Sequence, residues 1–146
     1  MTDQQPVNIV MVEDDEGHAR LIERNIRRAG ISNTIRHFAD GHSALEFMFE
    51  GGDGPMLNGP ALVLLALNLP DMSGIDILAK IKAEPKLKRM PVVVLTTTDD
   101  KVEIQRCYDL GCNVYITKPV NYESFAEAIR QLGLFLSVIQ VPEAQV

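Results

Sequence analysis

Three runs of apolar residues, each about as long as a single strand, limit what this chain can fold into. Residues 7–12 are apolar except for Asn8, residues 62–67 are apolar throughout, and residues 91–96 read PVVVLT. Strands that are apolar on both sides, without alternation, are typical of a parallel sheet that helices cover on both faces. The three runs therefore predict an α/β protein with a parallel sheet.

Segments with helical spacing separate these runs, and residues 31–38 and 114–117 suit two further strands. The order is five strand–helix units, with a loop rich in glycine and proline at residues 50–60 and no domain boundary. Right-handed crossovers bring the C-terminal ends of all the strands to one edge of the sheet, where ligands of such sheets bind. The apolar helical positions are Ala19, Ile22 and Ile26; Ala44, Leu45 and Met48; Ile75, Leu78 and Ile81; Ile104, Cys107 and Tyr108; and Phe125, Ile129, Leu132 and Leu136.

Composition narrows the classes of function. A chain of 146 residues fits one domain, and its net charge of −6 argues against nucleic-acid binding. No charged-then-apolar leader and no apolar run of about 20 residues is present, so we expect no membrane span and a cytoplasmic location. Cys107 and Cys112 are expected to be reduced core residues, and the three histidines share no spacing typical of a metal site.

Acidic, hydroxyl and basic residues stand where the predicted strands end. Glu13 and Asp14 close the first strand, and two adjacent acids repel each other unless a cation lies between them. Oxygen ligands of this kind suit Mg²⁺. Thr96 and Lys118 end two other strands and suit a phosphoryl group, which they would orient and neutralise. The glycine-rich loop that a nucleotide-binding enzyme of this architecture needs after its first strand is absent from EDDEGHAR.

The motifs VEDDE, LNLPDMSG, PVVVLTT and YITKP follow one another at a characteristic separation. With them the sequence resembles the receiver domains of two-component response regulators over nearly the whole chain. The resemblance implies a flavodoxin-like, doubly wound sheet of five parallel strands, (βα)5, in the order 2-1-3-4-5. It implies a single domain over residues 1–146, with a core at about residues 7–140 and no separate output domain. Such a protein is not an enzyme, and it accepts a phosphoryl group from a sensor histidine kinase.

The same resemblance assigns roles to individual residues. Ala66 stands where the family has its phosphoacceptor aspartate, and Glu13, Asp14 and the backbone carbonyl of Asn68 would form the metal site. Alanine can neither attack phosphorus nor bind a metal ion, so we expect a phosphorylation-dead chain with weakened Mg²⁺ binding. The remaining implied roles are Thr96 as the switch hydroxyl, Thr97 as the small residue beside it, Tyr115 as the switch aromatic, Lys118 as the phosphoryl-pairing lysine, and Lys118–Pro119 as a cis peptide.

Two explanations of Ala66 are open. A natural pseudo-receiver would work without phosphate as a protein-interaction module. A deliberate substitution would instead have silenced an otherwise competent receiver. Natural drift usually erodes several pocket residues together, whereas every other position of this pocket agrees with the family. The sequence therefore favours the deliberate substitution.

The end of the chain is more apolar than one domain needs. Residues 132–141 read LGLFLSVIQV, and only the stripe through Leu132 and Leu136 is required to cover the sheet. The surplus predicts a homodimer interface, with a folded-back tail as the alternative. This extension and the loop at residues 50–60 resemble the single-domain regulators of bacterial phytochromes, which implies a bacteriophytochrome kinase as partner. The predicted interface residues are Leu134, Phe135, Val138 and Ile139.

Overall fold

The computed structural model describes residues 8–28, 31–49, 61–97 and 99–118, together with residues 123 and 127. Five strands form one parallel sheet in the order β2-β1-β3-β4-β5. The predicted α/β fold and strand order are thereby confirmed. The strands are β1 (Asn8–Val12), β2 (Ile35–Phe38), β3 (Ala61–Ala66), β4 (Val92–Thr96) and β5 (Val114–Thr117).

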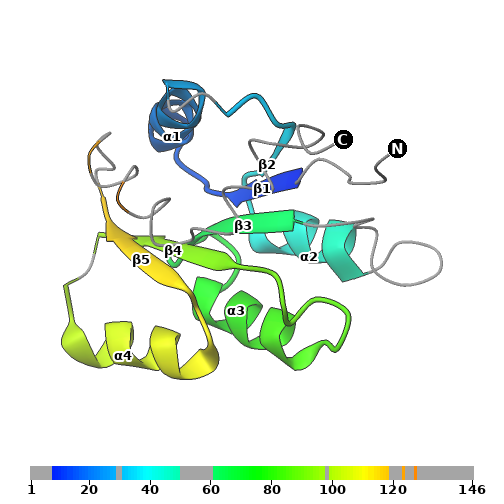
Figure 1. Cartoon of the computed structure of the whole chain (residues 1–146). Coiled ribbons are helices and arrows are strands. Elements are labelled where there is room, and N and C mark those ends of the chain that lie inside the picture. The colour runs from blue at the N-terminus through cyan, green and yellow to red at the C-terminus, as the bar shows by residue number, and fades with distance from the viewer. Residues whose placement is uncertain are drawn as a thin grey trace, which may run out of the picture.

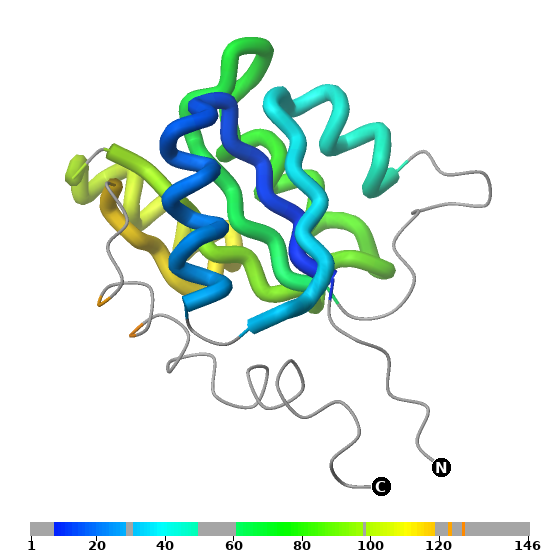
Figure 2. The backbone as a smooth tube through the Cα atoms, turned by 90° about the horizontal axis from the view of Figure 1, so that it is seen from above, coloured from blue at the N-terminus to red at the C-terminus, as the bar shows by residue number. Residues whose placement is uncertain are grey.

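Within the described residues, four helices cover the two faces of the sheet. Helix α1 lies on one face, and α2, α3 and α4 lie on the other (Figure 1). Figure 2 looks onto the α1 side, where the helix runs along the strands. The helices are α1 (Glu16–Arg28), α2 (Gly41–Phe49), α3 (Gly74–Ala83) and α4 (Lys101–Leu110).

The central strands are buried on both sides, as their unbroken apolar sequence requires. In β1, Ile9 and Met11 pack in the cluster on the α1 side, whereas Val10 and Val12 pack in the cluster on the opposite side. All six residues of β3 are buried, and the first five belong to the same two clusters. The period-two alternation of side chains therefore divides each apolar run between two cores.

Some predicted boundaries shift. Strand β2 starts at Ile35 and not at Ile31, because its pairing begins opposite Ile9, near the start of β1. Ile31 is buried but precedes the paired segment. The expected helix from Tyr122 onward lies largely outside the described residues, and so does the loop at residues 50–60. The four residues of the predicted dimer interface, Leu134, Phe135, Val138 and Ile139, lie outside them as well.

Two expectations from composition can be compared with the fold. Cys107 and Cys112 are buried free thiols, and burial raises the pKa of Cys112 to about 12. Within the described ranges, no helix has both the length and the apolar character to cross a bilayer. The buried free thiols agree with what the sequence predicts for the two cysteines.

Helix α3 starts almost in contact with the end of β3. Ser73 caps the helix by accepting a hydrogen bond from Ile75 N, and Gly74 N donates to Leu67 O at 2.8 Å. A Cβ atom on Gly74 would lie 2.2 Å from the backbone oxygen of Ala66 and 2.8 Å from Leu67 Cα. These are backbone atoms, which cannot shift without a substantial cost in free energy. Glycine at position 74 therefore fixes how closely α3 approaches the end of β3.

Replacing Gly74 by alanine should lower the free energy of unfolding by about 1–3 kcal/mol, because the added methyl group overpacks a backbone contact. Gly17→Ala is a matched control. The Cβ added there meets only a carboxylate oxygen of the Asp15 side chain, at 3.2 Å, and alanine favours a helix over glycine by about 1 kcal/mol. Urea unfolding of both variants measures the difference. A Gly74→Ala protein as stable as the starting protein would contradict the close approach.

Candidate functional site

The strand register brings residues from four strands to one edge of the sheet. Ala66 is the last residue of β3 and pairs with Leu95 of β4, so Thr96 follows directly at the edge. On the other side of β3, β1 ends opposite the residue before Ala66, which leaves Glu13 level with Ala66. Lys118 N donates to Thr96 O at 2.7 Å and extends the ladder beyond β5. The register therefore brings together the ends of β1, β3, β4 and β5.

The predicted site residues divide into two groups by burial. Glu13 and Ala66 are completely buried, and Thr96 is 2% exposed. A buried carboxylate and a buried hydroxyl need polar partners, because an unpaired polar group inside a protein is costly. Asp14, Asn68 and Thr97 are exposed, and Lys118 lies between the two groups.

Glu13 and Lys118 form an ion pair across the strand ends. Lys118 Nζ lies 2.7 Å from Glu13 Oε1, with 10% of the lysine side chain exposed and none of the glutamate side chain. The other carboxylate oxygen, Oε2, accepts a hydrogen bond from Asp15 N at 3.0 Å. Breaking a buried ion pair by removing one partner typically costs about 3–5 kcal/mol. The lysine is therefore the counter-ion of the glutamate, a pairing that the sequence did not predict.

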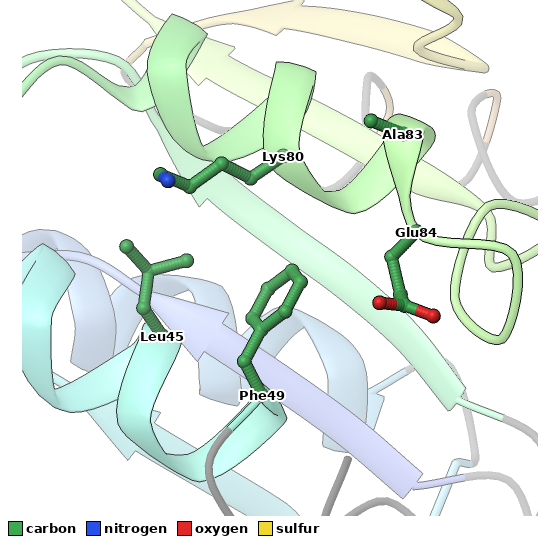
Figure 3. Close-up of a pocket in the computed structure, with 5 residues that line it drawn as sticks. All are labelled: Leu45, Phe49, Lys80, Ala83 and Glu84. Atoms are coloured by element: carbon green, nitrogen blue, oxygen red, sulfur yellow. The ribbon is translucent and has the colours of Figure 1, made fainter. Parts of the chain in front are cut away.

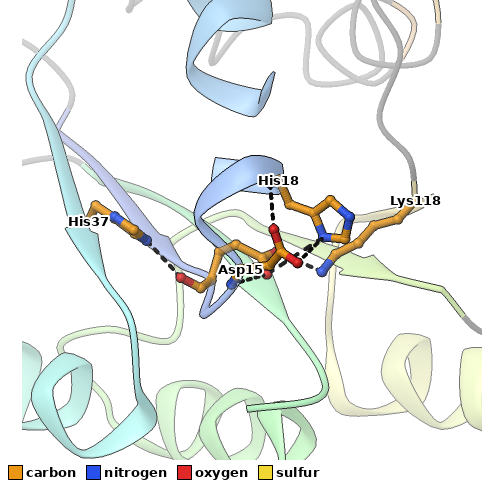
Figure 4. A network of polar contacts seen from close by, with 5 residues as sticks. Asp15, His18, His37 and Lys118 are labelled. Atoms are coloured by element: carbon orange, nitrogen blue, oxygen red, sulfur yellow. Dashed lines mark hydrogen bonds and ion pairs between the residues drawn. The ribbon is translucent and has the colours of Figure 1, made fainter. Parts of the chain in front are cut away.

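Asp15, the third acid of the motif VEDDE, has a structural role. Asp15 Oδ1 accepts a hydrogen bond from His18 N at 2.9 Å, and Asp15 O accepts one from Ala19 N. The His18 N–H is the main reason that the pKa of Asp15 is lowered. Asp15 is thus the N-cap of α1, and an acid directly before an amphipathic helix was a signal available in the sequence. Figure 4 shows Asp15 and His18 beside Lys118.

His37 forms a hydrogen bond with the backbone just after the end of β1. Its Nε2 atom donates to the backbone oxygen of Glu13 at 2.7 Å, from the neighbouring strand β2 (Figure 4). A neutral His37 therefore carries its proton on Nε2. No local pattern in the sequence predicts this contact, because the two residues are 24 positions apart and meet only through sheet pairing.

The predicted switch aromatic, Tyr115, lies on β5, whereas the predicted switch hydroxyl, Thr96, ends β4. Tyr115 is half-buried, and the Thr117 hydroxyl donates to its phenolic oxygen at 3.4 Å. The Tyr115 ring meets the ring of Tyr108 of α4 edge to face, with 6.5 Å between the centroids. The predicted cis peptide involves Pro119, which lies outside the described residues.

A second carboxylate that sequence reasoning missed connects the loop after β3 to helix α2. Asp71 accepts hydrogen bonds from Gly41 N at 2.9 Å and His42 N at 2.8 Å, and its carboxylate also contacts the His42 ring. The Gly41 N–H contributes most to lowering the pKa of Asp71 to about 2. A negative charge at a helix N-terminus is favourable. The loop that follows Ala66 is therefore anchored at both of its ends.

The acidic side chains at this edge differ from those of a typical magnesium site. Mg²⁺ needs near-octahedral oxygen ligands, usually with one or two carboxylates. Glu13 is engaged by Lys118, and Asp15 caps α1, so only Asp14 is an uncommitted acid at this edge. Among the residues that the structure describes, no three His, Cys, Asp or Glu side chains gather to hold a metal ion. In this arrangement the described side chains do not fit the metal that the sequence predicts.

A hollow between α2 and α3 is a separate feature. Leu45 and Phe49 line it from α2, and Lys80, Ala83 and Glu84 line it from the α3 side (Figure 3). These residues share no member with the strand edge. Lys80 and Glu84 are the charged residues of its lining, whereas the strand edge gathers an acid, a hydroxyl and an ammonium group from different strands. The strand edge is therefore the better candidate for chemistry.

The sequence and fold of this chain are similar to those of known proteins. The sequence model of one protein family, the response regulator receiver domain, matches residues 9–130. A receiver domain from Rhodospirillum rubrum is 67% identical, and its crystal structure covers 92% of this chain and 96% of its own with a TM-score of 0.77. The bacteriophytochrome response regulator RtBRR is 33% identical over 88% of this chain and 79% of its own, with a TM-score of 0.78.

The response regulator Rcp1 from Synechocystis is 34% identical over 95% of both chains. The structure of its Mn²⁺-bound form covers 91% of each chain with a TM-score of 0.71. A family model that covers most of the chain, together with relatives of this identity and coverage, shows the family. The chain belongs to the response regulator receiver domains of two-component signalling, and it is related to the response regulators of phytochromes.

Proposed function

We propose that this chain is a receiver whose phosphoacceptor position is Ala66, so that it cannot accept a phosphoryl group. Receiver domains are signalling modules that interact with histidine kinases. In such a module an aspartate carboxylate attacks phosphorus, and a methyl group cannot. The proposed function is that of a receiver held permanently in its unphosphorylated form, acting by protein interaction and not as an enzyme.

One observation carries this proposal. The buried methyl group of Ala66 stands at the end of β3, level with Glu13 and one residue short of Thr96. Lys118 reaches the same edge from β5. An acid, a hydroxyl and an ammonium group around one strand end form a set that suits a phosphoryl group, and only the nucleophile is lacking.

The relatives support a partner of a particular kind. RtBRR is named as a bacteriophytochrome response regulator, and a related structure is that of the phosphorylated cyanobacterial phytochrome response regulator RcpA. We infer a phytochrome-type sensor histidine kinase as the partner of this chain. Rcp1 aligns over 95% of both chains, so the similarity to this phytochrome-related regulator extends over nearly all of each sequence. The cytoplasmic location stays a prediction from the sequence.

The metal belongs to the same proposal. Receiver domains bind divalent metal ions, and Rcp1 has a Mn²⁺-bound form. For this chain we infer weakened Mg²⁺ binding, because Ala66 contributes no oxygen and Glu13 is paired with Lys118. Asp14 and the Asn68 carbonyl are the ligands that remain.

A natural pseudo-receiver is the second candidate function. The Glu13–Lys118 ion pair favours it, because a pocket that neutralises its own buried acid needs no phosphoryl group to be stable. The agreement of Thr96 and Lys118 with a phosphoryl-binding set favours the silenced receiver instead. Restoring the aspartate distinguishes the two.

Ala66→Asp should gain a phosphoryl group from acetyl phosphate in the presence of Mg²⁺, whereas the starting protein should gain none. Intact-mass spectrometry measures the gain. Without metal the variant should also melt at a lower temperature near neutral pH, because a third carboxylate adds repulsions of up to about 4 kcal/mol per pair at 4 Å. Mg²⁺ should recover much of that loss, since the ion binds the folded three-acid site.

The control for this experiment is Ala66→Asn, which has the shape of the aspartate without its charge and should remain unmodified. Phosphorylation of the starting protein itself would show that Ala66 is not at the phosphoacceptor position. A folded Ala66→Asp protein that takes up no phosphate would favour the pseudo-receiver.

The predicted dimer can be tested independently of the pocket. Phe135→Asp with Ile139→Asp should shift the sedimentation of a dimer towards monomer at micromolar concentration, because two charges would be buried in an apolar interface. Ser137→Asp with Gln140→Asp is the matched control from the same segment and should leave the dimer intact. A starting protein that sediments as a monomer would refute the interface.

A further inference from the structure

The Glu13–Lys118 ion pair has a consequence for cation binding. We propose that the Lys118 ammonium group takes the place of the divalent cation in this pocket and keeps such an ion out for as long as position 66 is alanine. The inference rests on the proposed role of Ala66 and adds a mechanism for the loss of metal binding. The cause is an internal cation that competes for Glu13, and not only a missing ligand.

Both oxygens of the Glu13 carboxylate are already engaged. Oε1 lies 2.7 Å from Lys118 Nζ, and Oε2 accepts a hydrogen bond from Asp15 N at 3.0 Å. His18 Nδ1 also lies near this carboxylate, at 3.9 Å from Oε2. The backbone oxygen of Glu13 accepts from His37 Nε2. A metal ion would have to displace one of these partners before it could use Glu13 as a ligand.

Burial makes Lys118 hard to displace. Glu13 is fully buried, and only 10% of the Lys118 side chain is exposed. A buried carboxylate needs a charge or several donors beside it, because water cannot solvate it. An ammonium group on the same chain is always present at the site, whereas a free ion must be drawn from solution. The lysine therefore has the advantage wherever the site needs only one positive charge.

The charges of the acidic residues and of Lys118 indicate how much positive charge the site can accept. Inside the site the charges of Glu13 and Lys118 cancel, and the negative charges that remain lie on the exposed side chains of Asp14 and Asp15. An aspartate at position 66 would add one uncompensated negative charge at the buried end of β3. Without that charge, a divalent ion beside Glu13 would leave excess positive charge next to an ammonium group that is itself largely buried. Ala66 thus changes the preferred cation from a metal ion to the lysine.

Mn²⁺ titration followed by electron paramagnetic resonance tests this proposal on the full chain. The starting protein should not lower the signal of free Mn²⁺ up to millimolar concentrations. Lys118→Met should bind Mn²⁺ at least about tenfold more tightly, because the competing cation has been removed. Lys101→Met is the control: it removes an exposed lysine at the start of α4 and should bind as weakly as the starting protein.

Lys118→Met combined with Glu13→Gln should lose the gained affinity if the ion uses Glu13. Mn²⁺ should raise the melting temperature of Lys118→Met and not that of the starting protein. Equal Mn²⁺ affinities of the starting protein and Lys118→Met, both folded by circular dichroism, would overturn the proposal.

A second measurement needs no variant. In the ¹⁵N-labelled starting protein, millimolar Mn²⁺ should leave the amide resonances of Glu13 and Lys118 sharp. Selective broadening of these two signals at low Mn²⁺ concentrations would overturn the proposal even if Lys118→Met failed to fold. The Mn²⁺ experiments and the phosphorylation experiment can fail independently. Ala66→Asp can accept phosphate whether or not Lys118 excludes metal from the alanine form.

Discussion

The parallel register of β1, β3, β4 and β5 determines what this protein can do. It sets Glu13 level with Ala66 and brings Thr96 and Lys118 to the same edge. The two cores above and below the sheet hold that register, since a slip of one residue would exchange the faces of every strand residue. Gly74 and Asp71 then fix the loop that follows Ala66 against α2 and α3.

Within this frame, a single methyl group alters the electrostatics of the pocket. With an aspartate at position 66, a further acid would lie at this edge, and a divalent ion would relieve the repulsion among the acids. With alanine, Lys118 lies 2.7 Å from the buried carboxylate of Glu13. We therefore expect the pocket to be stable without phosphate or metal. On this proposal the same residues form a switch or a fixed module, depending on one side chain.

The sequence predicted the fold and the strand edge well, because both depend on local patterns. Unbroken apolar runs identified β1, β3 and β4. The Glu13–Lys118 pair was not predicted, because the ends of β1 and β5 are separated by two strands, β3 and β4, and only the reach of the lysine joins them. The Asp71 contact with α2 was missed for a similar reason, since its partners are about 30 residues away in the chain.

The central claim is that Lys118 serves as the counter-ion of Glu13 when position 66 is alanine. A double-mutant cycle with Glu13→Gln and Lys118→Met, measured by urea unfolding, tests it most directly. We predict a coupling energy of about 1–3 kcal/mol in the starting protein. In the Ala66→Asp background the coupling should be smaller, because the lysine is then shared between two carboxylates. A coupling energy near zero in the starting protein would contradict the account.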